Sequence, residues 1–182
     1  MIHIEQIHHV AYRCTDARQT VEFYKKYLHM DLMVCIAEER VPSTKEPDPY
    51  MHVFLDAGQG NILAFFEITG NPPMDRDRNT PKWVQHIAFQ VKDSEALHEA
   101  KAELEAKGLD VLGVTEHGII RSLYFFDPNG HRIELTCVTG TPDQMKHLKD
   151  IAPAMLEEWS RTKRPPRQAA WLHESEFSRK PR

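Results

Sequence analysis

Two histidines and two glutamates recur at matching places in the two halves of the chain. His9 opens the segment HVAYRCTD, and His86 opens the similar segment HIAFQVKD. Glu67 in FEIT and Glu134 in IELT match each other in the same way. Two imidazoles and two carboxylates form a suitable ligand set for a divalent ion such as Fe, Zn, Ni or Mn. The two carboxylates would also balance the charge of the ion.

Side-chain alternation along strands predicts where these four residues point. If residues 7–14 form a strand, His9 shares a face with Ala11 and Arg13, and the small alanine leaves room for a ligand. The second half repeats this arrangement around His86. We therefore expect all four candidate ligands on the less apolar face of four strands, two from each half.

Each half of the chain is predicted to fold as the same βαβββ module. Short alternating apolar segments predict the strands, and an apolar stripe at helical spacing predicts the helix. The expected elements of the first module are strand 7–14, a helix from the capping residue Asp16 to near His29, and strands 31–37, 51–56 and 61–69. Those of the second module are strand 84–91, helix 94–107, and strands 109–114, 119–126 and 131–138.

The fold class predicted from this repeat is α+β. The modules are expected at residues 1–70 and 83–139, with a polar, proline-containing linker at 71–82. Residues 140–182 are expected to add an amphipathic helix, from Pro142 to Arg161, and a charged tail. The proline-containing segment from Arg40 to Pro49 is long for a connection and is predicted to act as a lid.

Composition argues against several classes of protein. With 23 Lys plus Arg, 27 Asp plus Glu and a net charge of −4, the chain has no broad positive field for nucleic acid or anionic lipid. It has neither a transmembrane-length apolar run nor the apolar core of a signal peptide. A soluble, cytoplasmic protein is expected, with buried, reduced thiols at Cys14, Cys35 and Cys137.

Three segments resemble the vicinal oxygen chelate superfamily, which includes glyoxalase I, type I extradiol dioxygenases, and fosfomycin- and bleomycin-resistance proteins. They are IHHVAYRCTDARQTVEFYKKYL, VQHIAFQVKD and DPNGHRIELT, and the resemblance covers about residues 5–138. It implies that the paired modules curl into a cup around a divalent metal. His9, His86 and Glu134 match the superfamily's metal positions, and Glu67 matches the fourth ligand of glyoxalase-type members. The resemblance also implies a small-molecule substrate and a homodimer.

The segment from Thr115 to Glu134 resembles the signature of extradiol ring-cleavage dioxygenases, in which a His and a Tyr precede an Asp-Pro-x-Gly turn and the metal-binding Glu. In such enzymes the metal is Fe(II). By this resemblance, His117 would be the acid/base beside the reacting oxygen, and Tyr124 would hydrogen-bond the substrate. The leading hypothesis is Fe(II)-dependent extradiol cleavage of a catechol-like aromatic.

Two alternatives follow from the same residues. Three protein ligands leave three positions on an octahedral ion, whereas Glu67 as a fourth ligand leaves two, which suits a glyoxalase-like isomerase or lyase with Zn, Ni or Mn. A metal-free binding protein of the bleomycin-resistance kind is the third reading, but such proteins usually lack the His and Glu ligands. The larger extradiol enzymes have a further active-site histidine, a role that is vacant here unless His52 fills it.

Overall fold

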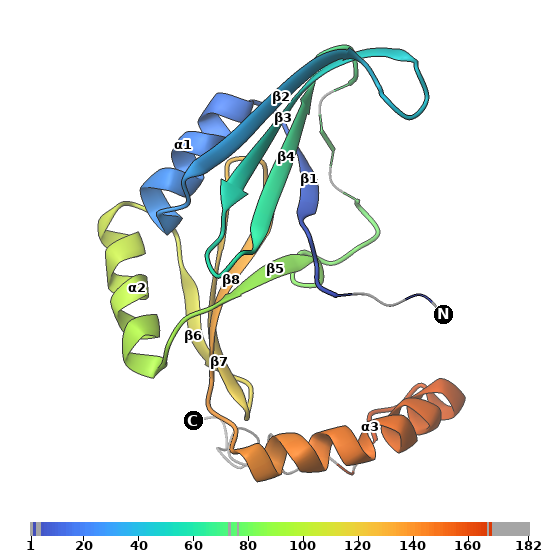
Figure 1. Ribbon diagram of the computed structural model, residues 1–182. Coiled ribbons are helices and arrows are strands. Elements are labelled where there is room, and N and C mark those ends of the chain that lie inside the picture. Colours follow the sequence, from blue (N-terminus) through green and yellow to red (C-terminus); the bar gives the residue numbers. More distant parts are fainter. Residues whose placement is uncertain (1, 3–4, 73, 76, 167, 169–182) are drawn as a thin grey trace. The chain divides into compact units, whose positions relative to one another are not determined.

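The structure is a computed structural model that describes residues 2, 5–72, 74–75, 77–166 and 168 (Figure 1). The helices of this described part are α1 (Ala17–Leu28), α2 (Ser94–Ala106) and α3 (Pro142–Thr162). Its strands are β1 (Val10–Cys14), β2 (Leu32–Arg40), β3 (Pro47–Asp56), β4 (Ile62–Ile68), β5 (His86–Gln90), β6 (Leu112–Glu116), β7 (Ile120–Phe126) and β8 (Arg132–Val138).

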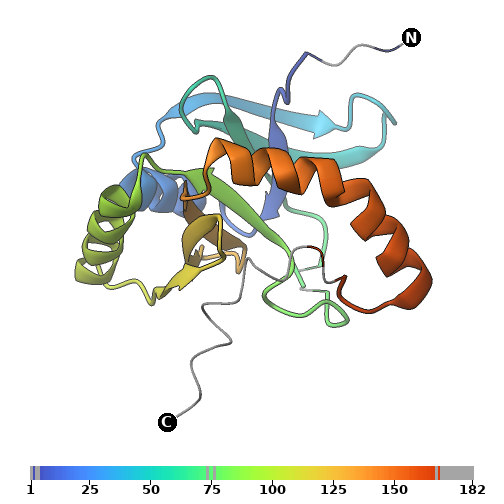
Figure 2. The same ribbon diagram turned by 90° about the horizontal axis from the view of Figure 1, so that it is seen from below.

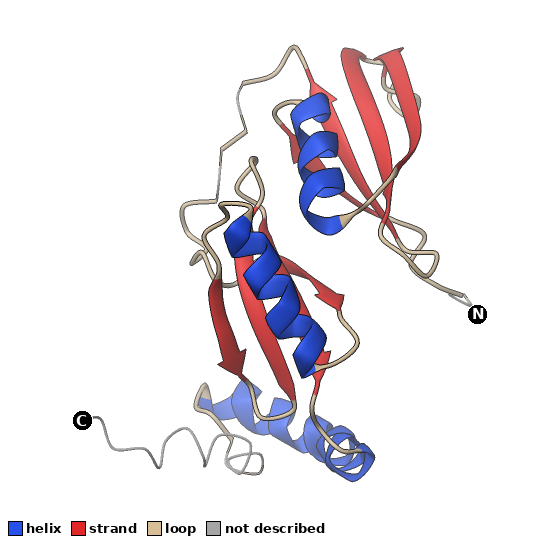
Figure 3. Ribbon diagram, turned by 90° about the vertical axis from the view of Figure 1, so that its left-hand side faces the viewer, coloured by secondary structure: helices blue, strands red, loops and turns tan. Residues whose placement is uncertain are grey.

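The strands form two four-stranded sheets of the same order, β1-β4-β3-β2 and β5-β8-β7-β6. In each sheet the first strand is followed by a helix, and Figure 3 shows that each helix covers one face of its own sheet. The predicted α+β class with two βαβββ modules is therefore confirmed. The chain divides into two compact units, Met1–Gln85 with Phe126–Arg132, and His86–Phe125 with Ile133–Arg182.

In the first unit, α1 forms where the sequence predicts it. The Asp16 carboxylate accepts a hydrogen bond from the backbone N of Gln19 at 2.7 Å, and His29 ends the helix in a left-handed conformation. The helix packs on the sheet through Tyr24, whose ring centroid lies 5.0 Å from that of Phe65. Both aromatic side chains are fully buried, so they form the centre of this unit's core.

The edge of the first sheet differs from the prediction. Strands β2 and β3 remain paired as far as Arg40 and Pro47, which leaves only a short connection between them. Arg40 and residues 47–49 of that segment are paired strand, so the connection of residues 41–46 is shorter than predicted, and its role as a lid stays a prediction. Every residue of β2, the edge strand of this sheet, is exposed.

The turn between β7 and β8 belongs to the first unit. Its Asp127 carboxylate is only 5% exposed and accepts hydrogen bonds from the Tyr24 hydroxyl at 3.2 Å and from the backbone N of Asn129 and His131 at 2.9 and 2.8 Å. Burial, together with this carboxylate, raises the pKa of the Tyr24 phenol well above its ordinary value, so the hydroxyl remains a donor. The Asn129 side chain in turn accepts a hydrogen bond from the backbone N of Thr15.

In the second unit, α2 begins at Asp93, whose carboxylate accepts a hydrogen bond from the backbone N of Ala96 at 3.0 Å. Its predicted apolar stripe is confirmed, since Leu97 and Leu104 are buried. One face of the sheet supplies the rest of this core, with the buried side chains Leu123, Phe125, Ile133, Leu135 and Cys137. The opposite face carries the polar residues described below.

The predicted C-terminal helix is confirmed as α3 (Figure 2). Thr141 and Gln144 form a capping box at its start. None of its residues is buried, and the apolar side chains Met145, Leu156 and Trp159 are exposed. The predicted tail lies outside the described residues from 169 onward. Within the described part of the chain, no helix combines the length and apolar character that crossing a membrane requires.

The three cysteines are all free, but they lie in different environments. Cys14 and Cys137 are buried as predicted, whereas the prediction is wrong for Cys35, which is exposed on the edge strand β2. Burial is the main cause that raises the pKa of the Cys14 thiol to about 11. At about pH 8, roughly one Cys14 thiol in a thousand would be ionised even if it were accessible.

We expect a thiol reagent such as DTNB to modify Cys35 alone in the native protein at about pH 8. Cys14 and Cys137 should react only after denaturation, because they are buried. Mass spectrometry of the labelled peptides measures this order directly. Rapid native labelling of Cys14 would contradict its burial.

Asp127→Ala should lower the free energy of unfolding by about 3 kcal/mol, because several buried donors lose a charged acceptor at once. Urea denaturation followed by circular dichroism measures the change. The matched control is Asp110→Ala, at an exposed loop position, with an expected change below about 0.5 kcal/mol. Equal effects of the two variants would show that the Asp127 turn has no special role.

Candidate functional site

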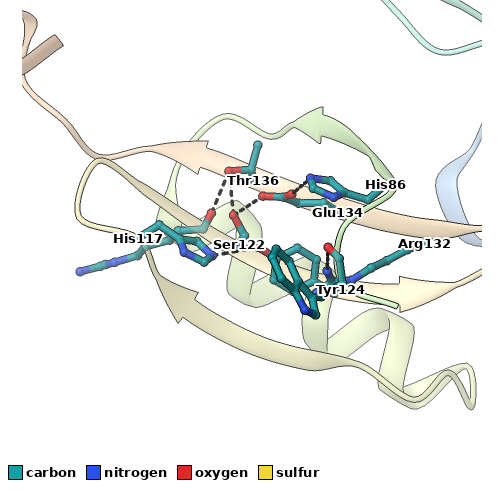
Figure 4. A network of polar contacts seen from close by, with 9 residues as sticks. His86, His117, Ser122, Tyr124, Arg132, Glu134 and Thr136 are labelled. Carbon is teal, nitrogen blue, oxygen red and sulfur yellow. Dashed lines mark hydrogen bonds and ion pairs between the residues drawn. The ribbon is translucent and has the colours of Figure 1, made fainter. Parts of the chain in front are cut away.

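One face of the second unit's sheet gathers a group of polar side chains (Figure 4). His86 begins β5, Glu134 lies on the neighbouring strand β8, and Ser122 and Tyr124 lie on β7, two residues apart and therefore on the same face. His86 Nε2 lies 2.9 Å from Glu134 Oε2. The structure thus brings two of the predicted ligands together, and their binding of a metal stays a prediction.

The carboxylate of Glu134 is held at both oxygens. While Oε2 faces His86, Oε1 accepts a hydrogen bond from the Ser122 hydroxyl at 2.5 Å. Ser122 is fully buried and Glu134 is 4% exposed, so water cannot readily replace either contact. Ser122 also lies 3.0 Å from the Thr136 hydroxyl, which donates to the carbonyl oxygen of Arg121. Sequence reasoning missed Ser122 and Thr136, although their spacing from Tyr124 and Glu134 places them on the same face.

The close approach of β6 beside Ser122 requires a glycine. Gly113 has a φ of +108° at an irregularity in the β6–β7 pairing, a conformation that other residues rarely adopt. A Cβ atom there would lie 2.8 Å from the carbonyl oxygen of Ser122. Gly113 thus allows the hairpin that carries Ser122 and Tyr124 to keep this geometry.

The two predicted catalytic residues, His117 and Tyr124, are hydrogen-bonded to each other in this unit. His117 Nε2 and the Tyr124 hydroxyl are 2.8 Å apart, and which of them donates depends on the imidazole tautomer. Tyr124 is 9% exposed, and its ring lies edge-on to that of His86, with 6.3 Å between ring centroids. Tyr124 therefore neighbours both His86 and His117.

His9 lies in the first unit, directly before β1, next to two aromatic rings of the sheet, those of Phe54 and His52. Its ring centroid is 5.7 Å from that of Phe54 and 6.1 Å from that of His52. Its Nδ1 also lies 2.8 Å from Nδ1 of His8. His52 is 8% exposed and stacks on Phe66, with ring centroids 3.6 Å apart. Burial, assisted by the neighbouring His9, lowers the pKa of His52 and favours its neutral form.

Glu67 lies on the opposite face of this sheet from His9. In the β1–β4 pairing it stands beside Cys14, on the side that carries Phe65 and α1. Its Oε2 accepts a hydrogen bond of 2.7 Å from the backbone N of Ala17, the first residue of α1. The expectation that all four candidate ligands share the less apolar faces is therefore corrected: Glu67 points to the N-terminus of α1, where the helix dipole favours a carboxylate.

Within the residues that the structure describes, no three His, Cys, Asp or Glu side chains are gathered as a metal-binding group. The His86–Glu134 pair nevertheless suits a divalent ion. Its N–O separation of 2.9 Å is close to the roughly 3 Å between adjacent ligands of an ion with bonds of about 2.1 Å. A buried carboxylate beside an imidazole, with its second oxygen held by a hydroxyl, is a typical environment for a metal ligand.

Ser122→Ala should lower the free energy of unfolding by about 1–3 kcal/mol, because Glu134 Oε1 would stay buried without its donor. Urea denaturation of the metal-free protein measures this effect. Ser160→Ala is the matched control, since Ser160 is exposed on α3, and its effect should stay within about 0.5 kcal/mol. If both variants unfold alike, Ser122 does not support Glu134.

Residues 6–135 match the family described as the Glyoxalase/Bleomycin resistance protein/Dioxygenase superfamily. The chain is 31% identical over 136 residues to the “Putative ring-cleaving dioxygenase MhqA” of Bacillus subtilis (strain 168), an alignment that covers 73% of this chain and 40% of that protein. The chain thus spans less than half the length of this relative.

Two further relatives match over most of their own length. The metallothiol transferase FosB of Shouchella clausii (strain KSM-K16) is 32% identical over 120 residues, covering 59% of this chain and 80% of FosB. The crystal structure of the fosfomycin resistance protein FosX from Listeria monocytogenes with Mn(II) and sulfate superposes with a TM-score of 0.53 at 22% identity, covering 79% of this chain and 99% of FosX. This last likeness concerns the fold alone. The family match over residues 6–135 shows that the chain belongs to the glyoxalase/bleomycin resistance protein/dioxygenase superfamily.

Proposed function

We propose that this protein is a divalent-metal-dependent enzyme that cleaves the ring of a catechol-like aromatic, with Fe(II) as the metal. The observation that carries the proposal is the hydrogen bond between His117 and Tyr124, beside the His86–Glu134 pair on one sheet face. An acid/base and a hydroxyl that can bind substrate thus lie next to two candidate metal ligands. The 31% identity with MhqA supports the same reaction class.

His86 and Glu134 of the second unit and His9 of the first are the metal ligands in this proposal. Bound Fe(II) would supply Lewis acidity and the one-electron redox chemistry that oxygen-dependent ring cleavage needs. With three protein ligands, the ion would keep room for a substrate with two oxygen atoms and for dioxygen. Glu67 is not part of the proposed set, because it lies on the α1 face of its sheet, opposite to His9.

His117 and Tyr124 would handle the protons of the substrate. His117 is half-buried and joined to the Tyr124 hydroxyl, so a proton can pass between the imidazole and an oxygen that Tyr124 holds. Because Tyr124 is nearly buried, its hydroxyl is fixed in direction and can orient a substrate hydroxyl. Ser122 would keep Glu134 in place throughout the reaction, since it bonds the oxygen that does not face His86.

The placement of Glu67 weakens the isomerase or lyase alternative with Zn, Ni or Mn, which rested on that residue as a fourth ligand. Metal-dependent transfer of a thiol becomes the second candidate, because the chain covers 80% of the FosB relative but 40% of MhqA. A small-molecule substrate is common to both candidates. That the protein is a cytoplasmic homodimer stays a prediction.

The test is oxygen uptake by protein that has been purified anaerobically and loaded with Fe(II). With a panel of catechol, 3-methylcatechol and 2,3-dihydroxybiphenyl, we expect oxygen consumption and a yellow ring-opened product. His117→Ala should lower kcat at least about 100-fold while the iron content stays unchanged, because it removes the acid/base and no ligand. His98→Ala, on the exposed surface of α2, is the control and should be fully active.

The variants His9→Ala and Glu134→Ala should lose both iron and oxygen uptake. No uptake with any catechol at full iron occupancy would contradict ring cleavage. If the metal-loaded protein consumes a thiol and no oxygen, the result would favour the transferase candidate.

A further inference from the structure

Two buried nitrogen atoms in the first unit have no hydrogen-bonding partner among the described residues. They are Nε2 of His52 and Nε of Arg13. Buried polar atoms in folded proteins are nearly always paired with protein, water or ligand. Two such atoms in one small sheet therefore indicate a place where a ligand completes the pairing.

These residues flank the same aromatic side chain. Arg13 on β1 and His52 on β3 are both paired with Phe66 on the strand between them, β4. Directly paired residues project from the same face of a sheet, so Arg13, Phe66 and His52 form one row on the face opposite α1. Two strand spacings, about 10 Å, separate the outer members of this row.

The side chains of the row are held in place. His52 is stacked on Phe66 and lies 4.0 Å from Phe54 between ring centroids, so its imidazole cannot turn away. Arg13 donates one guanidinium nitrogen, NH2, to the carbonyl oxygen of Pro72. This bond holds the guanidinium in place, and its Nε–H group can still donate to another acceptor.

The chemistry of the row selects a class of ligand. Phe66, Phe54 and Tyr50, whose ring centroid is 5.4 Å from that of Phe66, offer aromatic surface. The Arg13 Nε–H group carries positive charge and is best paired with an anionic oxygen. His52 Nε2 can donate or accept, according to its tautomer, and a hydroxyl group satisfies either state.

We propose that Arg13 and His52 bind the two polar ends of a hydroxylated aromatic acid that lies across Phe66. The carboxylate pairs with Nε–H of Arg13, and a ring hydroxyl hydrogen-bonds Nε2 of His52. This inference rests on the proposed function and narrows its substrate from catechols in general to catechols that carry an acid group. His52 also lies beside the candidate ligand His9, with 6.1 Å between ring centroids.

Binding is measured by calorimetry without oxygen, on the Fe(II)-loaded protein, with 3,4-dihydroxybenzoate and catechol as probes. The wild-type protein should bind 3,4-dihydroxybenzoate at least about tenfold more tightly, since the charge-assisted hydrogen bond is made only by the acid. Arg13→Met should abolish this preference and leave the affinity for catechol unchanged. Arg18→Met, at an exposed position of α1, is the control and should keep the preference.

His52→Phe should weaken binding of both probes by about tenfold, and His52→Gln should restore part of the affinity. Because its Nε2 has no partner, the midpoint of thermal unfolding should not fall in His52→Phe. A fall in that midpoint would show a structural role instead, and a loss of iron would show that His52 is a metal ligand. Either result overturns the proposed role of His52.

The two proposals fail in different ways. Three outcomes would overturn the aromatic-acid proposal even if the protein consumes oxygen with catechols. The wild-type protein could bind both probes with equal affinity, it could bind neither probe, or the preference for the acid could survive Arg13→Met. Arg13-dependent binding without any oxygen uptake would support the aromatic-acid proposal and remove ring cleavage as the function.

Discussion

The buried carboxylate of Asp127 holds the turn from which β8 starts. It accepts hydrogen bonds from the backbone N of Asn129 and His131 and from the Tyr24 hydroxyl, and β8 begins directly after this turn. Because side chains alternate along a strand, the start of β8 decides which residues face His86. A shift of one residue would bring an aliphatic side chain of the core to His86 and turn Glu134 toward the core. The turn therefore fixes the face on which the candidate ligand lies.

The same alternation gives two similar motifs different roles. Glu67 and Glu134 occupy matching places in the sequence, yet Glu67 faces α1 and Glu134 faces an imidazole. At Ala17 the carboxylate meets an N–H group of a helix N-terminus, which stabilises its negative charge. The first carboxylate stabilises the start of a helix, whereas the second pairs with an imidazole and a buried hydroxyl. The duplicated fold thus places two matching acidic residues in different environments.

The sequence is sufficient to predict the elements because their signals are local. Asp16 caps α1, and the apolar spacing of Leu97 and Leu104 marks α2, so both helices lie within about two residues of the expected ends. The extension of β2 and β3 could not be predicted, because its charged residues and prolines resemble a loop and only pairing makes it a strand. The face of Glu67 and the role of Ser122 depend on register between strands, which a single sequence does not contain.

The ionisation of Glu134 also limits which of the hydroxyl groups beside it can donate a hydrogen bond to which acceptor. Ser122 has one hydroxyl proton, and its oxygen lies within hydrogen-bonding distance of both Glu134 and Thr136. An ionised Glu134 can only accept, so Ser122 donates its proton to Glu134. The one proton of the Thr136 hydroxyl is then divided between two acceptors, the Ser122 oxygen and the carbonyl oxygen of Arg121. The ionisation state of Glu134 is thus linked, through two hydroxyl groups with one proton each, to a backbone carbonyl of β7.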